Sequence, residues 1–186
     1  MVTIFSLWLP ILVSAVFVFV ASSIMHMVLG YHNSDFKKLP DEDGVMDGLS
    51  SFDLPPGDYV VPCPANSKDM KSPEYQEKLN KGPVLMMTVM PSGQQSMGGS
   101  LLMWFVYSIL IGVFAAYIST RAIGSSGDYL DVFRFVGATS FIGYSMALMQ
   151  SSIWYKRSWA ATLKSMFDGL VYALLTAGTF GWLWPA

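Results

Sequence analysis

Charged side chains are scarce in this sequence, and cysteine is almost absent. Asp, Glu, Lys and Arg together make up 13% of the residues, about half of the roughly 25% that is typical of a soluble domain. The single cysteine, Cys63, excludes an intrachain disulfide. The chain also lacks a stripe of Lys and Arg, and its formal net charge is −2, so no nucleic-acid partner is expected.

The common catalytic and cofactor-binding motifs are missing as well. The sequence has no G-x-S-x-G elbow, no glycine-rich phosphate loop, no H-E-x-x-H and no C-x-x-C. The acidic stretch DEDGVMDG at 41–48 looks like a calcium loop, but it lacks the alternating ligands and the glutamate at the twelfth position. We therefore expect no catalytic residues and no cofactor, and an enzyme with an unfamiliar motif stays open as an alternative.

Long apolar blocks dominate what is present, and 53% of the residues are hydrophobic. Each of four blocks reaches the length of about 20 residues that a helix needs to cross a bilayer. Helices are expected because lipid offers no hydrogen-bond partner to an open strand edge. The predicted fold is an all-α membrane protein with four transmembrane helices, at 5–30, 100–122, 129–154 and 159–184. A cleaved signal peptide is the alternative for 5–30, but that segment lacks a basic start and its apolar run is too long.

Basic residues are distributed unevenly between the two sides of such a layout. Four of them flank the side that holds segments 31–99 and 155–158: Lys37, Lys38, Lys156 and Arg157. The other side has Arg121 and, one turn inside the third block, Arg134. Because Lys and Arg concentrate on the cytoplasmic side of membrane proteins, we expect segment 31–99 to be cytoplasmic. Both termini would then face the periplasm.

The loop at 31–99 is too long and too apolar to be a simple connector. Within it, GDYVVPCP is typical of a strand, and PVLMMTVM of a buried strand or a surface-lying apolar segment. SPEYQEKLNKG is typical of a helix that is capped by Ser72, begins at Pro73 and ends at Gly82. DEDGVMDGLSSF favours one or two amphipathic turns. The loop therefore predicts a small mixed α/β cap between the first two transmembrane helices.

Ionisable residues inside a predicted membrane helix are costly, and each is a candidate functional residue. Asp168 lies near the middle of the fourth block, and Lys164 precedes it by four residues, so the two can pair on one helical face. His26 and Gln150 lie near the same side of the first and third blocks. These four residues predict an intramembrane polar cluster. Two interpretations stay open: a hydrogen-bonded clasp that fixes helix order, or an ion- or proton-binding site of a small transporter.

A stripe of small residues recurs at every fourth position of the fourth block. It consists of Ser165, Gly169, Ala173, Ala177 and Gly181. A shorter stripe in the second block consists of Ser108, Gly112 and Ala116. Small residues let two helix backbones approach closely in lipid. We therefore predict a helix-packing seam on the fourth helix, against either the same chain or another copy, with Asp168 beside it and facing protein.

A metal site for copper(I) is a third possibility, because His, Met and Cys supply its soft ligands. The candidate ligands are Met25, His26, Met27, His32 and Cys63. Methionine is also a routine filler of apolar space. His26 and His32 are six residues apart, so they do not share a face of one continuous helix, and a haem pair on one helix is not expected.

Three stretches of the chain resemble a family of small bacterial membrane proteins. They are YHNSDFKKLPDEDGV, GPVLMMTVMP and WYKRSWAATLKSMFDGLVYALLTAGTFGWLWP, and the resemblance covers most of the chain. It implies a four-span layout in the bacterial inner membrane and supplies no catalytic residues, because the family carries no assigned activity. The first hypothesis is therefore a non-catalytic protein of the lipid bilayer that works as a homo-oligomer or as an accessory subunit of a larger membrane complex.

Overall fold

The computed structural model describes residues 2–123 and 127–185. The chain divides into two compact units. The first, here called the helical unit, comprises 1–37 and 96–186, and the second, the inserted unit, comprises 38–95. The expected cap is therefore shorter than the predicted 31–99, since residues 31–37 belong with the long helices.

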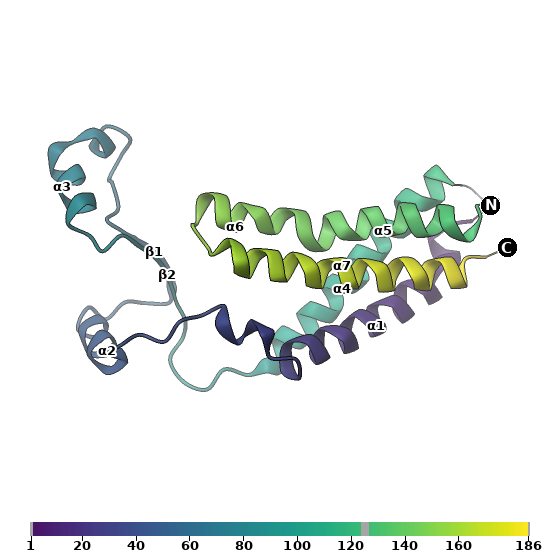
Figure 1. The fold of residues 1–186 in the computed structure, drawn as a ribbon, viewed down its shortest axis with the longest axis horizontal. Coiled ribbons are helices and arrows are strands. Elements are labelled where there is room, and N and C mark those ends of the chain that lie inside the picture. Colours follow the sequence, from purple (N-terminus) through teal and green to yellow (C-terminus); the bar gives the residue numbers. More distant parts are fainter. Residues whose placement is uncertain (1, 124–126, 186) are drawn as a thin grey trace. The chain divides into compact units, whose positions relative to one another are not determined.

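Among the described residues, four helical segments are long and apolar enough to cross a membrane (Figure 1). The first joins the 3₁₀ turn η1 (Ile4–Leu7) to α1 (Trp8–Met27), the second is α4 (Met97–Ala122) and the fourth is α7 (Trp159–Leu183). The third is interrupted, because α5 (Tyr129–Ser145) passes through the 3₁₀ turn η4 (Met146–Leu148) into α6 (Met149–Trp154). The start of α1 and the end of α7 lie at the same end of the helical unit.

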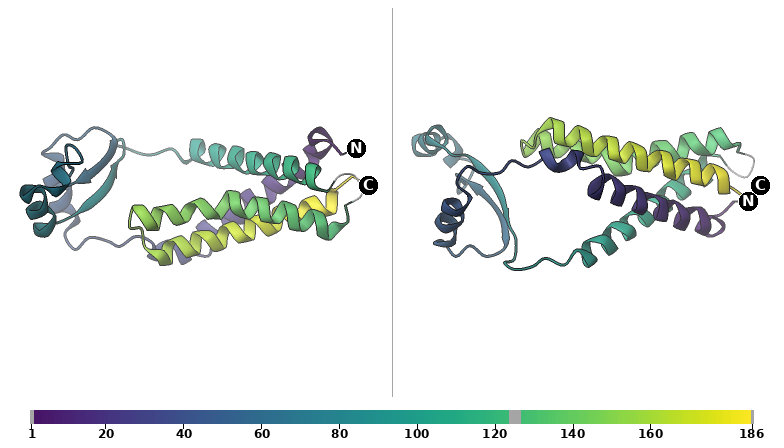
Figure 2. Two further views of the ribbon diagram at one scale, coloured as in Figure 1. Left: turned by 90° about the horizontal axis from the view of Figure 1, so that it is seen from above. Right: turned by 60° about the horizontal axis from the view of Figure 1, so that its bottom comes forward.

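Helices α5 and α7 lie side by side in every view, and the predicted seam of α7 is what brings them together (Figure 2). A Cβ atom added at Gly169 would lie 3.1 Å from the Cβ of Tyr144 on α5, and one added at Gly137 of α5 would lie 3.3 Å from the Cβ of Ala177. Gly181 approaches the ring of Tyr129 in the same way. The small residues of α7 therefore face a helix of the same chain.

The shorter stripe on α4 packs against α1. Ser108, Gly112 and Ala116 are buried, and a Cβ atom added at Gly112 would lie 3.3 Å from a methyl carbon of Ile11. Near the chain termini these contacts continue into an apolar core that includes Leu7, Val136 and Phe180.

The packing is looser toward the other end of the helical unit. The first turns of α4 carry large apolar side chains that are exposed, including Met97, Leu101, Leu102 and Met103. A second, smaller core of Val18, Met25, Tyr144 and Tyr172 lies at this end. The helical unit is thus closely packed at the end with the termini and open at the end where the predicted polar residues gather.

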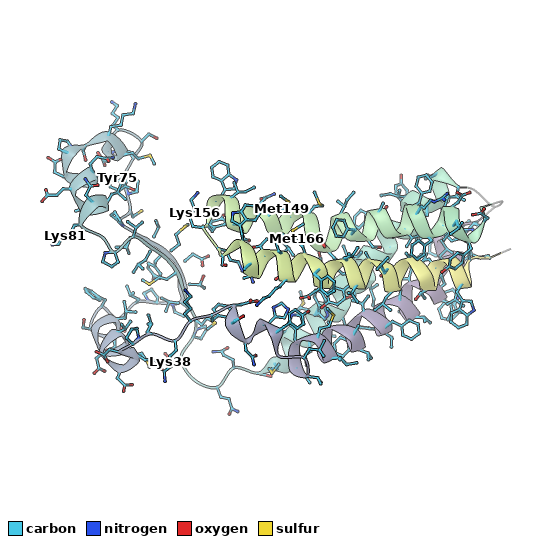
Figure 3. All side chains as sticks on the ribbon, in the orientation of Figure 1. Lys38, Tyr75, Lys81, Met149, Lys156 and Met166 are labelled. Atoms are coloured by element: carbon cyan, nitrogen blue, oxygen red, sulfur yellow. The ribbon has the colours of Figure 1, made fainter. Side chains whose placement is uncertain are left out.

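The inserted unit contains the expected mixture of strands and short helices. Strands β1 (Gly57–Val61) and β2 (Leu85–Val89) pair antiparallel, with Tyr59 opposite Met87. Helix α3 (Pro73–Lys81) begins after Ser72, whose side chain accepts a hydrogen bond from the backbone N–H of Tyr75, and it carries the Tyr75 and Lys81 side chains (Figure 3).

Helix α2 (Glu42–Ser50) explains the acidic stretch that looks like a calcium loop. The carboxylate of Asp41 accepts a hydrogen bond from the backbone N–H of Gly44 and so caps the helix. Glu42 and Asp43 lie in its first turn, where negative charge stabilises the positive end of the helix dipole. The acidic residues are thus accounted for by a helix start.

Candidate metal centre

The candidate site begins where the first long helix ends. Helix α1 stops at Met27, and Gly30 adopts a left-handed backbone with φ of +61°, a conformation that glycine adopts without a steric cost. This turn leads into the 3₁₀ turn η2 (Tyr31–Ser34). The chain therefore folds back, and residues 31–35 lie against α7.

Asp168 of α7 is the centre of the site and is only 3% exposed. The hydroxyl of Tyr31 donates a hydrogen bond to its Oδ1 atom. Nε2 of His32 lies 2.8 Å from Oδ2, and Nε2 of His26 lies 3.8 Å from the same oxygen. The chain has two histidines, and both direct the same ring nitrogen to one buried carboxylate.

The other ring nitrogen of each histidine has its own partner. Nδ1 of His26 lies 3.0 Å from the carbonyl oxygen of Ser22, and Nδ1 of His32 lies 2.7 Å from Oδ2 of Asp35. A carbonyl oxygen accepts, so the neutral ring of His26 carries its N–H on Nδ1 and leaves Nε2 as an acceptor. His32 has a carboxylate oxygen beside each ring nitrogen, so these contacts alone do not assign its N–H to one nitrogen. Histidines that bind metals are held in this way by a carboxylate or carbonyl on the second nitrogen.

Lys164 anchors the turn that carries His32. Its ammonium donates to the carbonyl oxygen of Tyr31 at 2.7 Å, to the hydroxyl of Ser34 at 2.7 Å and to Oδ1 of Asp35 at 2.9 Å. The predicted pair between Lys164 and Asp168 is therefore not formed. Tyr31 and His32 occupy the carboxylate of Asp168 instead, because η2 lies against α7.

Two groups outside the membrane-length helices have altered acidity. Hydrogen bonds from His32 and then Lys164 lower the pKa of the Asp35 carboxyl below its usual value. Desolvation, followed by the hydrogen bond to Asp168, raises the pKa of the Tyr31 hydroxyl above its usual range. Asp35 therefore stays an acceptor for His32, and Tyr31 stays a donor to Asp168.

The three facing atoms lie close enough together to be candidate ligands of one small metal ion. Nε2 of His26, Nε2 of His32 and a carboxylate oxygen of Asp168 all lie within 4.8 Å of one another. Ligands at about 2.0–2.1 Å from a tetrahedral ion are roughly 3.3 Å apart. The contacts of 2.8 Å and 3.8 Å to Asp168 lie on either side of that value. The two imidazole planes are 12° from parallel, and an ion lies in the plane of each imidazole that binds it, so one ring must rotate before both Nε2 atoms can bind the same ion.

The charges at the site also favour a cation. With both imidazoles neutral, the form that binds metals, the site contains two carboxylates and one ammonium. Lys164 pairs with Asp35, which leaves the charge of Asp168 unbalanced. Nε2 of His32 lies at hydrogen-bond distance, 2.8 Å, from Oδ2 of Asp168, so an ion bound by both atoms would take the place of that contact.

A pocket of about 490 Å³ adjoins the site. His26 and Asp168 line it together with exposed apolar side chains such as Met27, Met97 and Leu101. Four aromatic side chains also line it: Trp104, Tyr107, Tyr144 and Tyr172. These rings contact one another, with centroids 5.6–6.2 Å apart. Two of the three candidate ligands, His26 and Asp168, thus border a cavity of ligand size.

Several residues from the sequence analysis lie outside this site. The side chain of Gln150 is exposed and has no hydrogen bond with the cluster among the described residues. Cys63 is exposed in the inserted unit, and Met25 is buried in the smaller core. Met27 lines the pocket. Within residues 2–123 and 127–185, the group with metal-ligand spacing is His26, His32 and Asp168.

Sequence reasoning missed the role of the segment after the first helix. Tyr31 and Asp35 bond to members of the cluster, and His32 is one of its central residues. One feature of the sequence could have indicated this turn. Gly30, a residue type that commonly ends helices, is followed directly by the polar run Tyr-His-Asn-Ser-Asp.

Comparisons with protein-family models, with curated proteins and with solved structures give no match to this chain. The family resemblance of the three stretches therefore stays a prediction.

Proposed function

We propose that this chain is an integral membrane protein that binds one divalent first-row transition metal ion through His26, His32 and Asp168. The observation that carries the proposal is the convergence of both histidines on one buried carboxylate, each with its second nitrogen already hydrogen-bonded. Two imidazoles and a carboxylate form the ligand set of catalytic zinc sites and of non-haem iron(II) sites with open positions.

The donor atoms favour zinc or iron(II) over the copper(I) considered from the sequence. Copper(I) prefers thiolate and thioether ligands, and the group of described residues with metal-ligand spacing contains nitrogen and oxygen donors. The pocket on the open side leaves room for a further ligand on the ion. This arrangement is typical of a site that works on a bound molecule, whereas structural zinc sites are closed by four protein ligands.

The bacterial inner membrane is the proposed location, with both termini in the periplasm. Four apolar helices support the multi-pass layout, and the basic residues at positions 37, 38, 156 and 157 support a cytoplasmic inserted unit. Lys156 lies in the turn between α6 and α7 (Figure 3).

An oligomeric or accessory role stays a prediction. The seam of α7 faces α5 of the same chain. A conducting role also stays a prediction, and its test is ion or proton flux through vesicles that contain wild-type protein or Asp168→Asn.

The test of the metal proposal is elemental analysis of the full-length protein, purified gently from membranes and then titrated with zinc against a competing chelator. We expect one ion per chain, and loss of that ion in Asp168→Asn and in His32→Ala. Asp131→Asn, on α5, and Cys63→Ser are the controls and should bind metal like the wild type. Equal metal content in wild type and Asp168→Asn would reject the site.

A further inference from the structure

The aromatic pocket beside the three ligands has the features of a binding site for a lipid-soluble molecule. Its walls are mainly aromatic and aliphatic side chains, while His26 and Asp168 lie at one part of its surface. Met97 and Leu101, which line it from α4, are 65% and 38% exposed. If α4 spans the bilayer, these exposed side chains face lipid, and a molecule dissolved in the membrane can enter without crossing water.

The hydrogen bonds inside the pocket leave one buried group without a partner. The indole N–H of Trp104 donates to Ser22 at 2.8 Å, and the hydroxyl of Tyr107 donates to the carbonyl oxygen of Gly143 at 2.6 Å. Tyr172 lines the same pocket and is 4% exposed, yet its hydroxyl has no hydrogen-bond partner among the described residues. A buried hydroxyl without a partner is costly. The Tyr172 oxygen is covered in this structure, so a ligand could bond to it only after a side-chain movement uncovers it.

The charges of the residues that line the pocket disfavour a ligand with an anionic head group. Asp168 is the charged residue of the pocket, and neither Lys nor Arg occurs among the described residues that line it. Lys164 is turned to Tyr31, Ser34 and Asp35 instead. A phosphate or sulfate head group is normally held by Lys or Arg, so a phospholipid head group does not match this lining.

The aromatic side chains that line the pocket favour a ligand that contains a flat ring. Four aromatic side chains contact one another around the cavity, and flat rings gain from stacked or edge-to-face contact with such a cluster. The volume of about 490 Å³ falls in the usual range of ligand pockets, about 300–1,000 Å³. A single ring with a short length of attached chain is therefore well accommodated.

We propose that this pocket takes a neutral, hydroxyl-bearing ring compound from the bilayer, of the phenol or quinol class, with its apolar chain directed toward lipid. The inference rests on the proposed metal site for one contact: the ligand hydroxyl oxygen occupies the open side of the ion held by His26, His32 and Asp168. The hydroxyl of Tyr172 supplies the second polar contact once a side-chain movement uncovers it. The ring lies among Trp104, Tyr107 and Tyr144.

The probe for this proposal is a para-alkylphenol that carries a photoreactive diazirine in its alkyl chain. It is applied to the zinc-loaded, full-length protein in lipid nanodiscs, and labelled residues are located by mass spectrometry. We expect label on Met97, Leu101 or Leu148, which line the pocket. Unlabelled para-nonylphenol should compete with the probe, whereas para-nonylanisole, which lacks the O–H, and nonanoic acid, which is anionic, should not.

Two matched variants on α4 separate the pocket from general lipid contact. Leu101→Trp fills the pocket, and Met97→Trp does the same from a more exposed position. Leu110→Trp places the same side chain at a 50% exposed position of α4 that does not line the pocket. We expect loss of pocket labelling in the first two variants and wild-type labelling in the third, with zinc content and unfolding midpoint unchanged in all.

Measuring the zinc content distinguishes failure of the metal-site proposal from failure of the pocket-ligand proposal. Bound zinc, together with labelling that is equal in Leu101→Trp and Leu110→Trp, would overturn the pocket inference and leave the metal site in place. Competition by para-nonylanisole or nonanoic acid as strong as that by the phenol would overturn the assigned head group. Absence of zinc from the wild type would overturn the metal site, and with it the contact assigned to the hydroxyl oxygen.

Discussion

The imidazole rings of His26 and His32 stack, with centroids 4.6 Å apart and planes 12° from parallel. The stack joins the last turn of α1 to the turn that follows it and holds both Nε2 atoms on the side of Asp168. The two rings differ in their surroundings, because the His26 side chain is 52% exposed and that of His32 is 16% exposed. The two histidines should therefore contribute unequally to stability.

This difference predicts that His32→Ala destabilises the metal-free protein, whereas His26→Ala does not. His32 lies between two carboxylates, and its removal leaves them buried without their partner, a cost on the order of 3 kcal/mol. His26 is half exposed, so its loss should change the unfolding free energy by less than about 1 kcal/mol. Thermal unfolding after chelator treatment measures both. Similar midpoints for the two variants would contradict the assignment.

Asp35 should tune metal affinity without touching the metal. It accepts the hydrogen bond from Nδ1 of His32, and loss of such a supporting carboxylate typically weakens metal binding by about 10–100-fold. We expect Asp35→Ala to show this loss in a zinc competition titration. Asp35→Asn keeps an acceptor oxygen and should recover part of the affinity. If both variants bind zinc like the wild type, His32 is not a ligand.

Acid should release the same contact in the metal-free protein. The pKa of Asp35 is lowered in the fold, so its stabilising contribution is complete above the ordinary carboxyl value of 3.8 and is lost as the pH falls through the lowered value. Unfolding midpoints measured from neutral pH to below about pH 4 should therefore fall more steeply for wild type than for Asp35→Asn. Asp131→Asn, which removes an exposed carboxylate, is the control.

The seam between α5 and α7 predicts a contrast between two glycines of one helix. A Cβ atom at Gly169 would lie 2.1 Å from Oγ of Ser145 and 3.1 Å from the Cβ of Tyr144, so Gly169→Ala should cost about 1–3 kcal/mol of stability. A Cβ atom at Gly178 meets only the hydroxyl of Tyr129, at 3.9 Å. Gly178→Ala should be neutral or stabilise by up to about 1 kcal/mol. Thermal unfolding in detergent tests the contrast, and equal effects would reject the seam.

The single cysteine provides a test of orientation. Cys63 is exposed in the inserted unit, and we expect an impermeant maleimide to label it only after the inner membrane is permeabilised. The matched control is Asp128→Cys in a Cys63→Ser background, which places a thiol between α4 and α5 and should be labelled in intact spheroplasts. The reverse pattern would invert the proposed topology.

Local sequence signals predicted the fold well where short-range contacts decide it. Ser72, Pro73 and Gly82 mark the ends of α3 because caps act on their own helix. The four long helices follow from apolar length alone. Asp168 was expected to face protein, and its burial agrees with the small residues beside it on α7.

The candidate metal site depends on the turn at Gly30, and the spacing of apolar residues along the sequence does not predict that this turn brings His32 beside His26. His32 follows His26 by six positions, and a continuous helix would place the two on different faces. The left-handed Gly30 ends that regularity and reverses the chain. Lys164 was expected to pair with Asp168 by helical spacing, but a segment more than 100 residues earlier in the chain supplies its partners. Long-range contacts of this kind lie beyond a reading of local pattern.

Because the turn at Gly30 brings ligands from the first helix to the fourth, the site can form only after the fourth helix has been inserted. Two of its ligands belong to the first 32 residues of the chain, whereas the third lies on the last long helix. A nascent chain that has inserted three helices would carry both histidines without Asp168 and could not hold the ion. Metal loading would therefore report that the final helix has been inserted and has docked on the first.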